Sequence, residues 1–463
     1  MIKKNDIVEI KIDEILFPNK GKGIFDNNKI LVKNTIPGQK VLVKIKKKKG
    51  DNIEGTVLNI IKKSDIEIES KCSHFKFCGG CTYQNISHND ELKLKENQIL
   101  KLLENNNIKN FEYMGIVPSP NLEGYRNKCE FSFGDEQKDG DLALGMRKRM
   151  SNYEVVTLKD CNIIDNDYLK IIELVLNFFK EKDISFYHKM KHTGVLRHLV
   201  VRKSFTYGEI LVNLITTSEY NFSIEEFKNL LLNNNDIFEG SICGILHTIN
   251  DSVADVVKSD KTNLLYGKDY FVEKLFNLNF RISAFSFFQT NSKGAEKLYS
   301  VVKEFIGNAQ NKVIFDLYCG TGTISQILAE NAKKIIGIEI VDEAIYSAIE
   351  NAKFNNINNC EFIIGDVLNK IESLNNKPDI IVIDPPRDGI HPKAINKIIN
   401  FNASKIIYIS CKPTSLVRDL QIFEENNYKV EKIKLIDMFP RTYHIETVVL
   451  MKYYDILEKN NKK

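Results

Sequence analysis

The stretch Lys312-Val-Ile-Phe-Asp-Leu-Tyr-Cys-Gly-Thr-Gly-Thr323 decides the fold class of this chain. A short apolar run is followed by an acidic residue and two glycines, which let the backbone turn sharply and approach a ligand closely. Similar apolar runs recur at 335–338, 362–364, 380–383 and 406–409. Strands that are buried on both faces of a parallel sheet have this composition. We therefore predict an α/β fold with a Rossmann-like C-terminal domain.

Polar residues follow several of these runs, at the edge where open α/β sheets bind ligands. Glu339 ends the second run and can accept hydrogen bonds from a ribose diol, and Asp366 follows the third run and could hold an adenine amine. An acidic residue opens the glycine loop and the spacing is not Gly-x-Gly-x-x-Gly, which favours S-adenosylmethionine (SAM) over a nicotinamide cofactor. The alternative is a tight turn with a surface acid.

The fourth run ends in Asp384-Pro-Pro-Arg387, and its two prolines stiffen the turn and direct Asp384 outward. Amino-group methyltransferases use a related turn, but an aromatic residue usually follows the prolines. Arg387 in that place favours a chemistry other than attack by an exocyclic nitrogen.

A thiol and two candidate bases complete the predicted site. Cys411 ends the fifth run, beside Lys412, which could stabilise a thiolate. A lone cysteine is most often an inert core residue, but the position at the functional edge favours a nucleophile. His444 and Glu446 point to the same face if their segment is extended, and either could be the general base.

Three further thiols lie close together in Cys72-x5-Cys78-Gly-Gly-Cys81, and Cys161 lies 80 residues further on. Three close cysteines and one distant cysteine can hold a four-iron cluster. Tetrahedral zinc, held by the four cysteines or with His74, is the alternative.

The N-terminal residues form a basic module. Residues 1–63 carry 15 Lys/Arg and 7 Asp/Glu, a net +8, whereas the whole chain is only +4. Short β-rich runs broken by Gly21, Gly23 and Pro37-Gly38 predict a small OB-like barrel. A polyanion partner is expected for this module, and a solvated lysine-rich face is the alternative.

The middle of the chain mixes β-rich segments with a helix around 167–181, so we expect a central α+β domain. A helix at 88–105 is expected to pack on the catalytic domain, with Leu92, Ile99, Leu102 and Leu103 on its apolar face. The middle-domain candidates for RNA contact are Arg126, Lys128, Arg147, Lys148, Arg149 and Arg197.

Taken in order, these motifs, with Phe287-Phe-Gln-Thr-Asn291 and Phe439-Pro-Arg-Thr-Tyr-His-Ile-Glu-Thr447, resemble the bacterial RNA uracil-5-methyltransferases. The branch resembled has an N-terminal TRAM domain and an iron–sulfur cluster, and the match runs over nearly the whole chain. Lys412 is a departure, since many relatives carry Asn there. The resemblance implies a TRAM barrel at 1–62, a central iron–sulfur and RNA-binding domain at 63–280 and a SAM-dependent methyltransferase domain at 281–463.

The resemblance also implies roles for single residues. Cys411 would be the nucleophile and Glu446 the base, and Cys72, Cys78, Cys81 and Cys161 would hold a [4Fe–4S] cluster. The expected cofactor-binding residues are Gln289, Tyr318, Gly320, Glu339, Asp366 and Asp384.

The function expected on this basis is methylation of carbon 5 of a uridine in RNA. The substrate is expected to be 23S rRNA or a pre-ribosomal intermediate, because tRNA-modifying relatives usually lack both the TRAM domain and the cluster. tRNA methylation, an amino-nitrogen methyltransferase and a non-catalytic iron–sulfur RNA-binding protein are the alternatives. No apolar run approaches the ~18 residues of a membrane helix, and the N-terminus lacks the apolar core of a signal peptide, so we expect a cytoplasmic protein that does not contact a membrane. We also expect the protein to be a monomer.

Overall fold

The computed structural model describes residues 2–50, 52–254, 257, 259–371, 374 and 377–454. Two compact units are present. Unit 1 comprises residues 1–70, 81–118 and 385–463, and unit 2 comprises residues 71–80 and 119–384. The three-domain division expected from the sequence stays a prediction, and the last residues of its C-terminal domain, 455–463, lie outside the described residues.

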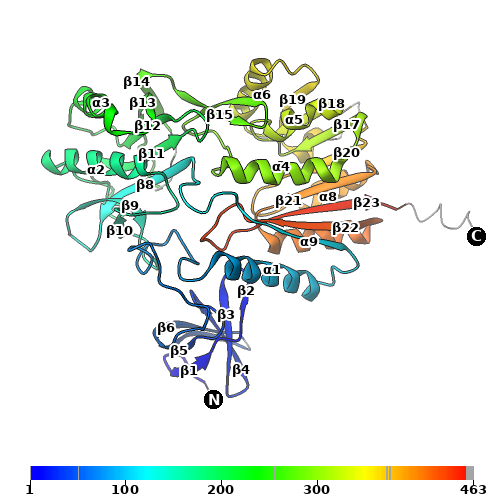
Figure 1. Ribbon diagram of the computed structural model, residues 1–463, viewed down its shortest axis with the longest axis horizontal. Helices are drawn as coiled ribbons and strands as arrows, with labels where there is room; N and C mark the ends of the chain where they lie inside the picture. The colour runs from blue at the N-terminus through cyan, green and yellow to red at the C-terminus, as the bar shows by residue number, and fades with distance from the viewer. Residues whose placement is uncertain are drawn as a thin grey trace, which may run out of the picture. The chain divides into compact units, whose positions relative to one another are not determined.

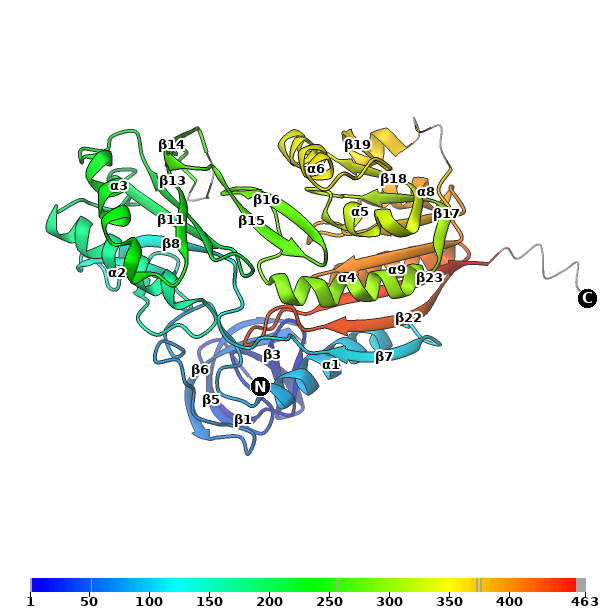
Figure 2. The same ribbon diagram turned by 45° about the horizontal axis from the view of Figure 1, so that its top comes forward.

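Unit 1 begins with a six-stranded sheet in the order β1-β5-β6-β4-β3-β2. The strands at the two ends of this order are separated by only two residues of the chain, so the sheet must curl back on itself, as Figure 2 shows. Its interior is filled by Ile and Val side chains, such as Ile12, Val41 and Ile45. The strands are β1 (Ile7–Lys11), β2 (Glu14–Leu16), β3 (Lys20–Phe25), β4 (Asn28–Lys33), β5 (Lys40–Lys49) and β6 (Asn52–Lys62).

The rest of the described part of unit 1 combines three helices with four strands. β21 pairs with β23, β23 with β22, and β22 with β7, the last pair being parallel. β7 continues the sheet beyond the β22–β23 pair, and the sequence analysis did not predict this strand. The elements are α1 (His88–Asn105), β7 (Glu112–Val117), α8 (Pro392–Ile399), β21 (Lys405–Ser410), α9 (Pro413–Glu425), β22 (Tyr428–Ile436) and β23 (Glu446–Tyr453).

Helix α1 contacts β2, β7 and α9, and Figure 2 shows it alongside β7. Its buried face differs from the expected one. Ile99 and Leu103 are buried, but Leu92 and Leu102 are only half-buried, and Glu91, Lys95 and Gln98 are buried with them. Charged side chains therefore occupy a face that was expected to be apolar.

Unit 2 contains a seven-stranded sheet in the order β10-β9-β8-β11-β12-β13-β14. Helices α2 and α3 contact each other and this sheet (Figure 1), and Phe133, Phe179 and Phe227 pack between them. The elements are β8 (Lys128–Asp135), β9 (Leu142–Arg147), β10 (Val155–Thr157), α2 (Asn166–Glu181), β11 (Leu196–Lys203), β12 (Glu209–Thr216), α3 (Ile224–Asn233), β13 (Ser241–Ile249) and β14 (Lys261–Gly267).

A hairpin, four helices and four parallel strands make up the rest of the described part of unit 2. The parallel strands have the order β19-β18-β17-β20, as the C-terminal apolar runs predicted. β20 is buried along its whole length, which explains its continuous Ile-Ile-Val-Ile sequence. The elements are β15 (Tyr270–Leu275), β16 (Leu278–Ser283), α4 (Ser292–Ile306), β17 (Ala309–Leu317), α5 (Thr323–Leu328), β18 (Ala332–Glu339), α6 (Asp342–Phe354), β19 (Cys360–Ile364), α7 (Val367–Lys370) and β20 (Ile380–Ile383).

Candidate active site

The glycine loop leaves the end of β17 in unit 2 with left-handed backbone. Tyr318, Gly320 and Gly322 have φ angles of 64°, 53° and 70°. A Cβ atom on Gly320 would meet no atom within 4 Å, so the space beside this residue is open. A Cβ atom on Gly322 would lie 2.6 Å from the Phe362 ring, so only glycine lets the loop pack against β19. The loop therefore combines a fixed backbone with an open side.

Glu339 connects the end of β18 to this loop. Its Oε2 accepts a hydrogen bond from the Gly320 N–H at 3.1 Å, and its Oε1 accepts from the N–H groups of Ile340 and Val341 at 2.8 and 3.1 Å. These bonds hold the carboxylate at the mouth of the loop, where it is half-buried. A group held in this way can accept hydrogen bonds from a vicinal diol without reorganising.

A buried carboxyl group, Asp316, and a half-buried one, Asp384, lie at the ends of neighbouring strands β17 and β20. Burial raises the pKa of Asp316 to about 7, although Ser325 Oγ donates to its Oδ2 at 2.6 Å. Burial, and then the charge of Asp316, raises the pKa of Asp384 to about 7 as well. Asp316 Oδ1 is buried and has no hydrogen-bond partner among the described residues. Since an unsatisfied buried acceptor is costly, a cationic or hydrogen-bond-donating ligand would stabilise this pair.

Gln289 and Asp366 are placed by other contacts of unit 2. Asn127 Nδ2 donates to the Gln289 carbonyl at 2.9 Å, and Asn291 caps α4 by accepting from the Gly294 N–H at 2.9 Å. Asp366 caps the short helix α7 by accepting from the Leu368 N–H at 2.9 Å. Asn127 lies 162 residues before Gln289 in the sequence, and only the hydrogen bond between them shows that Asn127 positions this motif.

Cys411 and Glu446 are brought together in unit 1 by strand register. The antiparallel pairing of β21 with β23 runs from Lys405 opposite Lys452 to Ser410 opposite Thr447. β21 ends at Ser410, so Cys411 directly follows the paired residues, and continuing the register by one step would set it opposite Glu446, the first residue of β23. Directly opposed residues have Cβ atoms ~5 Å apart on the same face. Cys411 is half-buried, and Glu446 is 4% exposed.

The segment around Cys411 is held by α9. Ser415 Oγ donates to the carbonyl groups of Arg387 and Lys412, both at 2.9 Å. These contacts connect the turn after Asp384 to the loop that contains Cys411. Cys411 lies two residues before the first residue of α9, and a helix N-terminus favours a nearby anion. Lys412 Nζ lies 3.7 Å from Asp388, so part of its charge is balanced by that exposed carboxylate.

A buried ion network holds the loop that leads to Glu446. Lys95 Nζ on α1 lies 2.7 Å from both Glu91 and Asp437. Glu91 accepts from the Arg441 N–H at 2.7 Å, and His88 lies 2.8 Å from Asp437. Burial opposes ionisation of Asp437, but the charges and hydrogen bonds of Lys95 and His88 hold its pKa below the usual range. Burial raises the pKa of Glu91.

The sequence analysis missed this network. Glu91 and Lys95 are spaced i, i+4, which is typical of an exposed helix face. One signal was available: Glu91 and Lys95 continue the four-residue spacing of Ile99 and Leu103, so all four share one face of the helix. The sequence does not indicate that the distant Asp437 is their partner.

The predicted metal-ligand cysteines lie in ordered segments. In unit 2, Cys72 and Cys78 are buried, and the Gly80 N–H donates to Cys78 Sγ at 3.3 Å. Ser73 Oγ donates to Asp160 Oδ1 at 2.9 Å, which ties the first segment to the residue before Cys161. In unit 1, Gln84 Nε2 donates to Cys81 Sγ at 3.5 Å. Among the described residues, no three His, Cys, Asp or Glu side chains converge as ligands of one metal ion.

The basic residues considered for RNA contact have different environments. Arg197 is 2% exposed and donates to the carbonyl groups of Asn250, Ser252 and Ala254, so the expectation of an RNA contact is wrong for this residue. These hydrogen bonds hold the segment 250–254 at the Arg197 guanidinium. Arg149 donates to the carbonyl groups of Phe75 and Cys78, so it stabilises the segment between Cys72 and Cys78.

Comparison with known proteins identifies the family. The model of the tRNA (uracil-5-)-methyltransferase family matches residues 87–454. The chain belongs to this family. A relative from Clostridium tetani, described as an uncharacterized RNA methyltransferase, is 48% identical over 98% of this chain and 100% of its own length. Another with the same description, from Caldanaerobacter subterraneus subsp. tengcongensis, is 48% identical over 97% of this chain and 99% of its own.

A solved member of similar architecture is the tRNA (uracil-54, C5)-methyltransferase of Pyrococcus abyssi in complex with S-adenosyl-L-homocysteine. It is 26% identical to this chain and superposes with a TM-score of 0.75, over 96% of this chain and 100% of its own. The resemblance of the motifs to uracil-5-methyltransferases is thereby confirmed. In this chain, among the residues that the structure describes, no helix is long and apolar enough to cross a membrane.

Proposed function

We propose that this protein transfers a methyl group from SAM to carbon 5 of a uridine in RNA, with Cys411 as nucleophile and Glu446 as base. The observation that supports the proposal is the pairing of β21 with β23, because Cys411 directly follows Ser410 and Glu446 directly precedes its partner Thr447. Family membership supports the reaction class. An amino-nitrogen methyltransferase would need neither the thiol nor a base opposite it.

The residues of the glycine loop fit SAM. The open space beside Gly320 would admit the cofactor, and the Glu339 carboxylate would accept from its ribose hydroxyl groups. The unsatisfied Asp316 Oδ1 and the neighbouring Asp384 supply negative charge for a cation. When bound, SAM supplies an electrophilic methyl group on a sulfonium. Gln289, Tyr318 and Asp366 are proposed to complete this site.

The roles of the chain's own residues follow from the chemistry of uracil. Carbon 5 is a poor nucleophile, and addition of the Cys411 thiolate to carbon 6 makes it an enolate carbon that can accept a methyl group. Glu446 then removes the proton from carbon 5. The carbon 6–sulfur bond breaks as the 5,6 double bond forms again, and Cys411 leaves as a thiolate. The uridine must leave its stack to reach these residues.

We favour 23S rRNA as the substrate, because the basic curled sheet and the cysteine pattern resemble the rRNA branch. tRNA is the second candidate. The solved tRNA enzyme matches 96% of this chain, a share that must include most of the curled sheet, so the sheet alone does not separate the two substrates. We further propose that one chain acts as a monomer.

Nucleoside analysis tests the reaction and the substrate together. Purified protein would be incubated with SAM and either unmodified 23S rRNA transcript or unmodified tRNA, and 5-methyluridine would be quantified by mass spectrometry. We expect 5-methyluridine in the rRNA arm. Product in the tRNA arm alone would overturn the rRNA assignment, and a methylated amino nitrogen would overturn the reaction.

We also propose that Cys72, Cys78, Cys81 and Cys161 hold a [4Fe–4S] cluster. Support comes from the N–H donors directed at Cys78 and Cys81, which stabilise sulfur ligands. Burial raises the pKa of Cys72 and Cys78, and a bound metal would offset the cost of ionising them. Anaerobically purified protein should contain ~4 iron and ~4 sulfide per chain. Stoichiometric zinc without sulfide would contradict this assignment.

A further inference from the structure

Two loops of unit 2 place cations and aromatic rings around one hollow. The first, Arg147-Lys-Arg-Met-Ser-Asn-Tyr153, joins β9 to β10, and the second, Phe186-Tyr-His-Lys-Met-Lys-His192, precedes β11. Tyr153 is 51% exposed, and Tyr153 Oη lies 3.5 Å from the sulfur of Met190 in the other loop. The seven-stranded sheet carries this hollow, and none of its lining residues belongs to the glycine loop.

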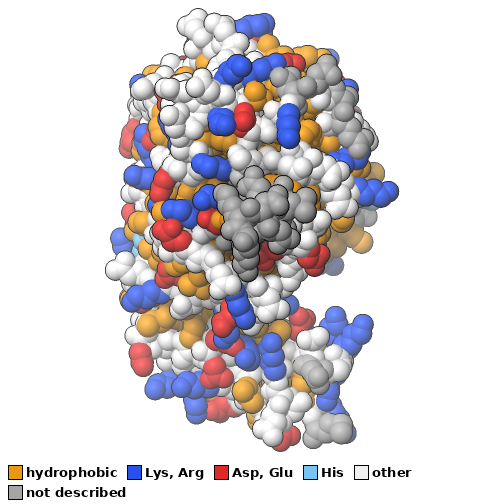
Figure 3. Space-filling model, turned by 90° about the vertical axis from the view of Figure 1, so that its right-hand side faces the viewer, with side chains coloured by type: hydrophobic (Ala, Val, Ile, Leu, Met, Phe, Trp, Pro, Cys, Tyr) orange, Lys and Arg blue, Asp and Glu red, His pale blue; other side chains and the backbone are white. Residues whose placement is uncertain are grey.

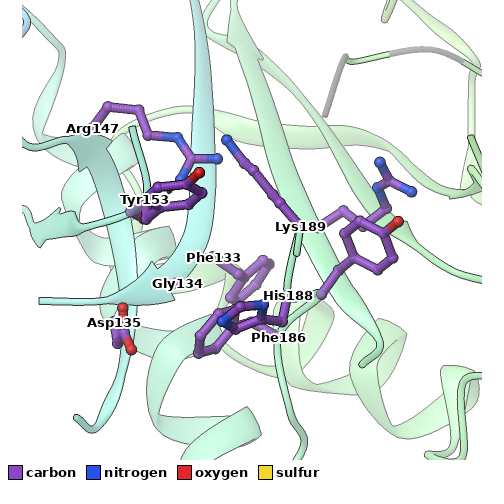
Figure 4. Close-up of a pocket in the computed structure, with 10 residues that line it drawn as sticks. Phe133, Gly134, Asp135, Arg147, Tyr153, Phe186, His188 and Lys189 are labelled. Atoms are coloured by element: carbon purple, nitrogen blue, oxygen red, sulfur yellow. Dashed lines mark hydrogen bonds between the residues drawn. The ribbon is translucent and has the colours of Figure 1, made fainter. Parts of the chain in front are cut away.

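The hollow has a cationic side and an aromatic side. Arg147 Nη1 donates to the Tyr153 carbonyl at 2.9 Å, and Lys189 Nζ donates to the Asn152 carbonyl at 3.2 Å, so both cations lie at the end of the first loop. Figure 4 shows the Lys189 side chain extending toward Arg147 and Tyr153, with the rings of Phe186 and His188 gathered apart from them. Asp135 also lines the hollow and accepts from the Asp139 N–H at 2.9 Å.

Both loops are held in place rather than loose. The Phe186 and His188 rings stack with centroids 6.3 Å apart, and His188 exchanges backbone hydrogen bonds with residues 192 and 193. Arg197 lies under the second loop, 4.2 Å from the Tyr187 ring centroid. The first loop is tied to the cysteine segment, where the Gly79 N–H donates to the Arg147 carbonyl at 2.9 Å. The arrangement of rings and cations therefore exists before any ligand binds.

We propose that this hollow binds an unpaired nucleotide of the RNA substrate, away from the reacting uridine. The base would stack on Tyr153 or on the Phe186–His188 pair, and the phosphate would contact Arg147 and Lys189. The Asp135 carboxylate can accept from the ring N3–H of a uracil base. The inference rests on the proposed function in taking RNA as the substrate, and it names a single-stranded segment as what unit 2 recognises.

Duplex RNA does not fit this arrangement, because stacked bases hide the faces that aromatic rings need. Basic residues interleaved with aromatic ones are typical of single-strand binding, in which cations follow the backbone and rings stack on bases. Charge alone does not single out such a site. On the face shown in Figure 3, basic side chains are mixed with acidic and hydrophobic ones.

The test measures binding of a fluorescein-labelled single-stranded oligouridylate to the full-length protein at several salt concentrations. Tyr153→Leu should weaken binding roughly tenfold without changing the salt dependence, since stacking is not electrostatic. Arg147→Gln combined with Lys189→Gln should reduce the slope of log affinity against log salt by up to ~1.4, because each phosphate contact on a single strand contributes ~0.7. A double-stranded RNA of equal length should bind less well.

Matched controls lie elsewhere in unit 2. Tyr266→Leu removes another exposed tyrosine, and Lys261→Gln combined with Lys297→Gln removes two exposed lysines. These variants should bind as the wild type does. Unfolding midpoints and SAM affinity, measured for every variant, show whether unit 2 is folded.

Wild-type affinity in Tyr153→Leu, or equal losses in the control variants, would overturn the inference. Competition by free uridine monophosphate as effective as that by the oligonucleotide would assign the hollow to a free nucleotide and overturn it too. If the wild type forms no 5-methyluridine but binds the oligonucleotide through Tyr153, the proposed function fails and this inference stands.

Discussion

Lys95 Nζ lies 2.7 Å from Asp437 Oδ1, and both side chains are buried although 342 residues separate them. Lys95 lies on α1, and Asp437 begins the loop that leads to Glu446. The Lys95 ammonium also donates to the Phe439 carbonyl at 3.3 Å. The helix therefore holds the loop that leads to Glu446 through one buried cation.

Lys95→Met should destabilise the protein by ~3–5 kcal/mol, because removing one partner leaves buried carboxylates uncompensated. Chemical denaturation followed by circular dichroism measures this. Lys93→Met changes an exposed lysine of the same helix and should lie within ~0.5 kcal/mol of the wild type. Equal effects of the two substitutions would show that the network does not stabilise the fold.

Cys411→Ala should reduce methyl transfer to background and leave SAM affinity unchanged, because the proposed cofactor contacts lie in unit 2. RNA that contains 5-fluorouridine should form a denaturant-stable adduct with the wild type, since fluorine cannot be removed as a proton. Gel electrophoresis after denaturation detects the adduct. Its persistence in Cys411→Ala would exclude this thiol as the nucleophile.

Glu446→Gln should slow turnover by ~10²–10⁴-fold, the usual contribution of a general base. Proton removal follows thiolate addition, so the methylated protein–RNA intermediate should accumulate on ordinary RNA and be visible by mass spectrometry. Normal turnover by this variant would transfer the role to His444, which a matching His444→Gln variant would then test.

The affinity for SAM should rise with pH between about 6 and 8, since the pKa values of Asp316 and Asp384 are both about 7. Above these values the two carboxyl groups become negative and attract the sulfonium, whereas below them they are neutral. Calorimetric titrations across this range measure the effect. S-adenosylhomocysteine has no sulfonium charge and should show a weaker dependence, as should Asp384→Asn with SAM.

The same two groups affect stability without ligand. Their folded pKa values exceed the unfolded value of 3.8, so their contribution to stability is fully present below pH 3.8 and is lost as pH rises through 7. Asp384→Asn should therefore stabilise the ligand-free protein more at pH 8 than at pH 5. Equal effects at both pH values would contradict the raised pKa of Asp384.

Replacing Lys46, Lys47 and Lys49 of β5 with Gln should weaken RNA binding and reduce the salt slope by up to ~2, as expected for three phosphate contacts on a single strand. The three side chains are exposed, so folding should be unaffected. Substitution is preferable to deletion of the curled sheet, because Tyr83 Oη donates to Asn19 at 3.2 Å and deletion would expose that buried pair. An unchanged slope would remove the electrostatic role of the sheet.

The sequence by itself determined the parallel strands and the order of the motifs. Short continuous apolar runs such as Ile380–Ile383 favour a strand that is buried on both faces of a parallel sheet. The residues that follow such strands then lie at the carboxyl edge of the sheet. The glycines at 320 and 322 likewise indicated a tight loop, because other residues are strained at their φ angles. These are local consequences of side-chain chemistry, which is why sequence alone predicted them.

Only the tertiary structure decided which distant side chains meet. Register set Ser410 opposite Thr447, which brings the neighbouring residues Cys411 and Glu446 to the same end of the strand pair, and a one-residue slip would have turned the side chains of one strand to the other face. Lys95 and Arg197 have the sequence signals of exposed residues, yet both are buried, since their partners are a carboxylate 342 residues away and three backbone carbonyls. Burial of a charge depends on partners that the chain brings close only by folding.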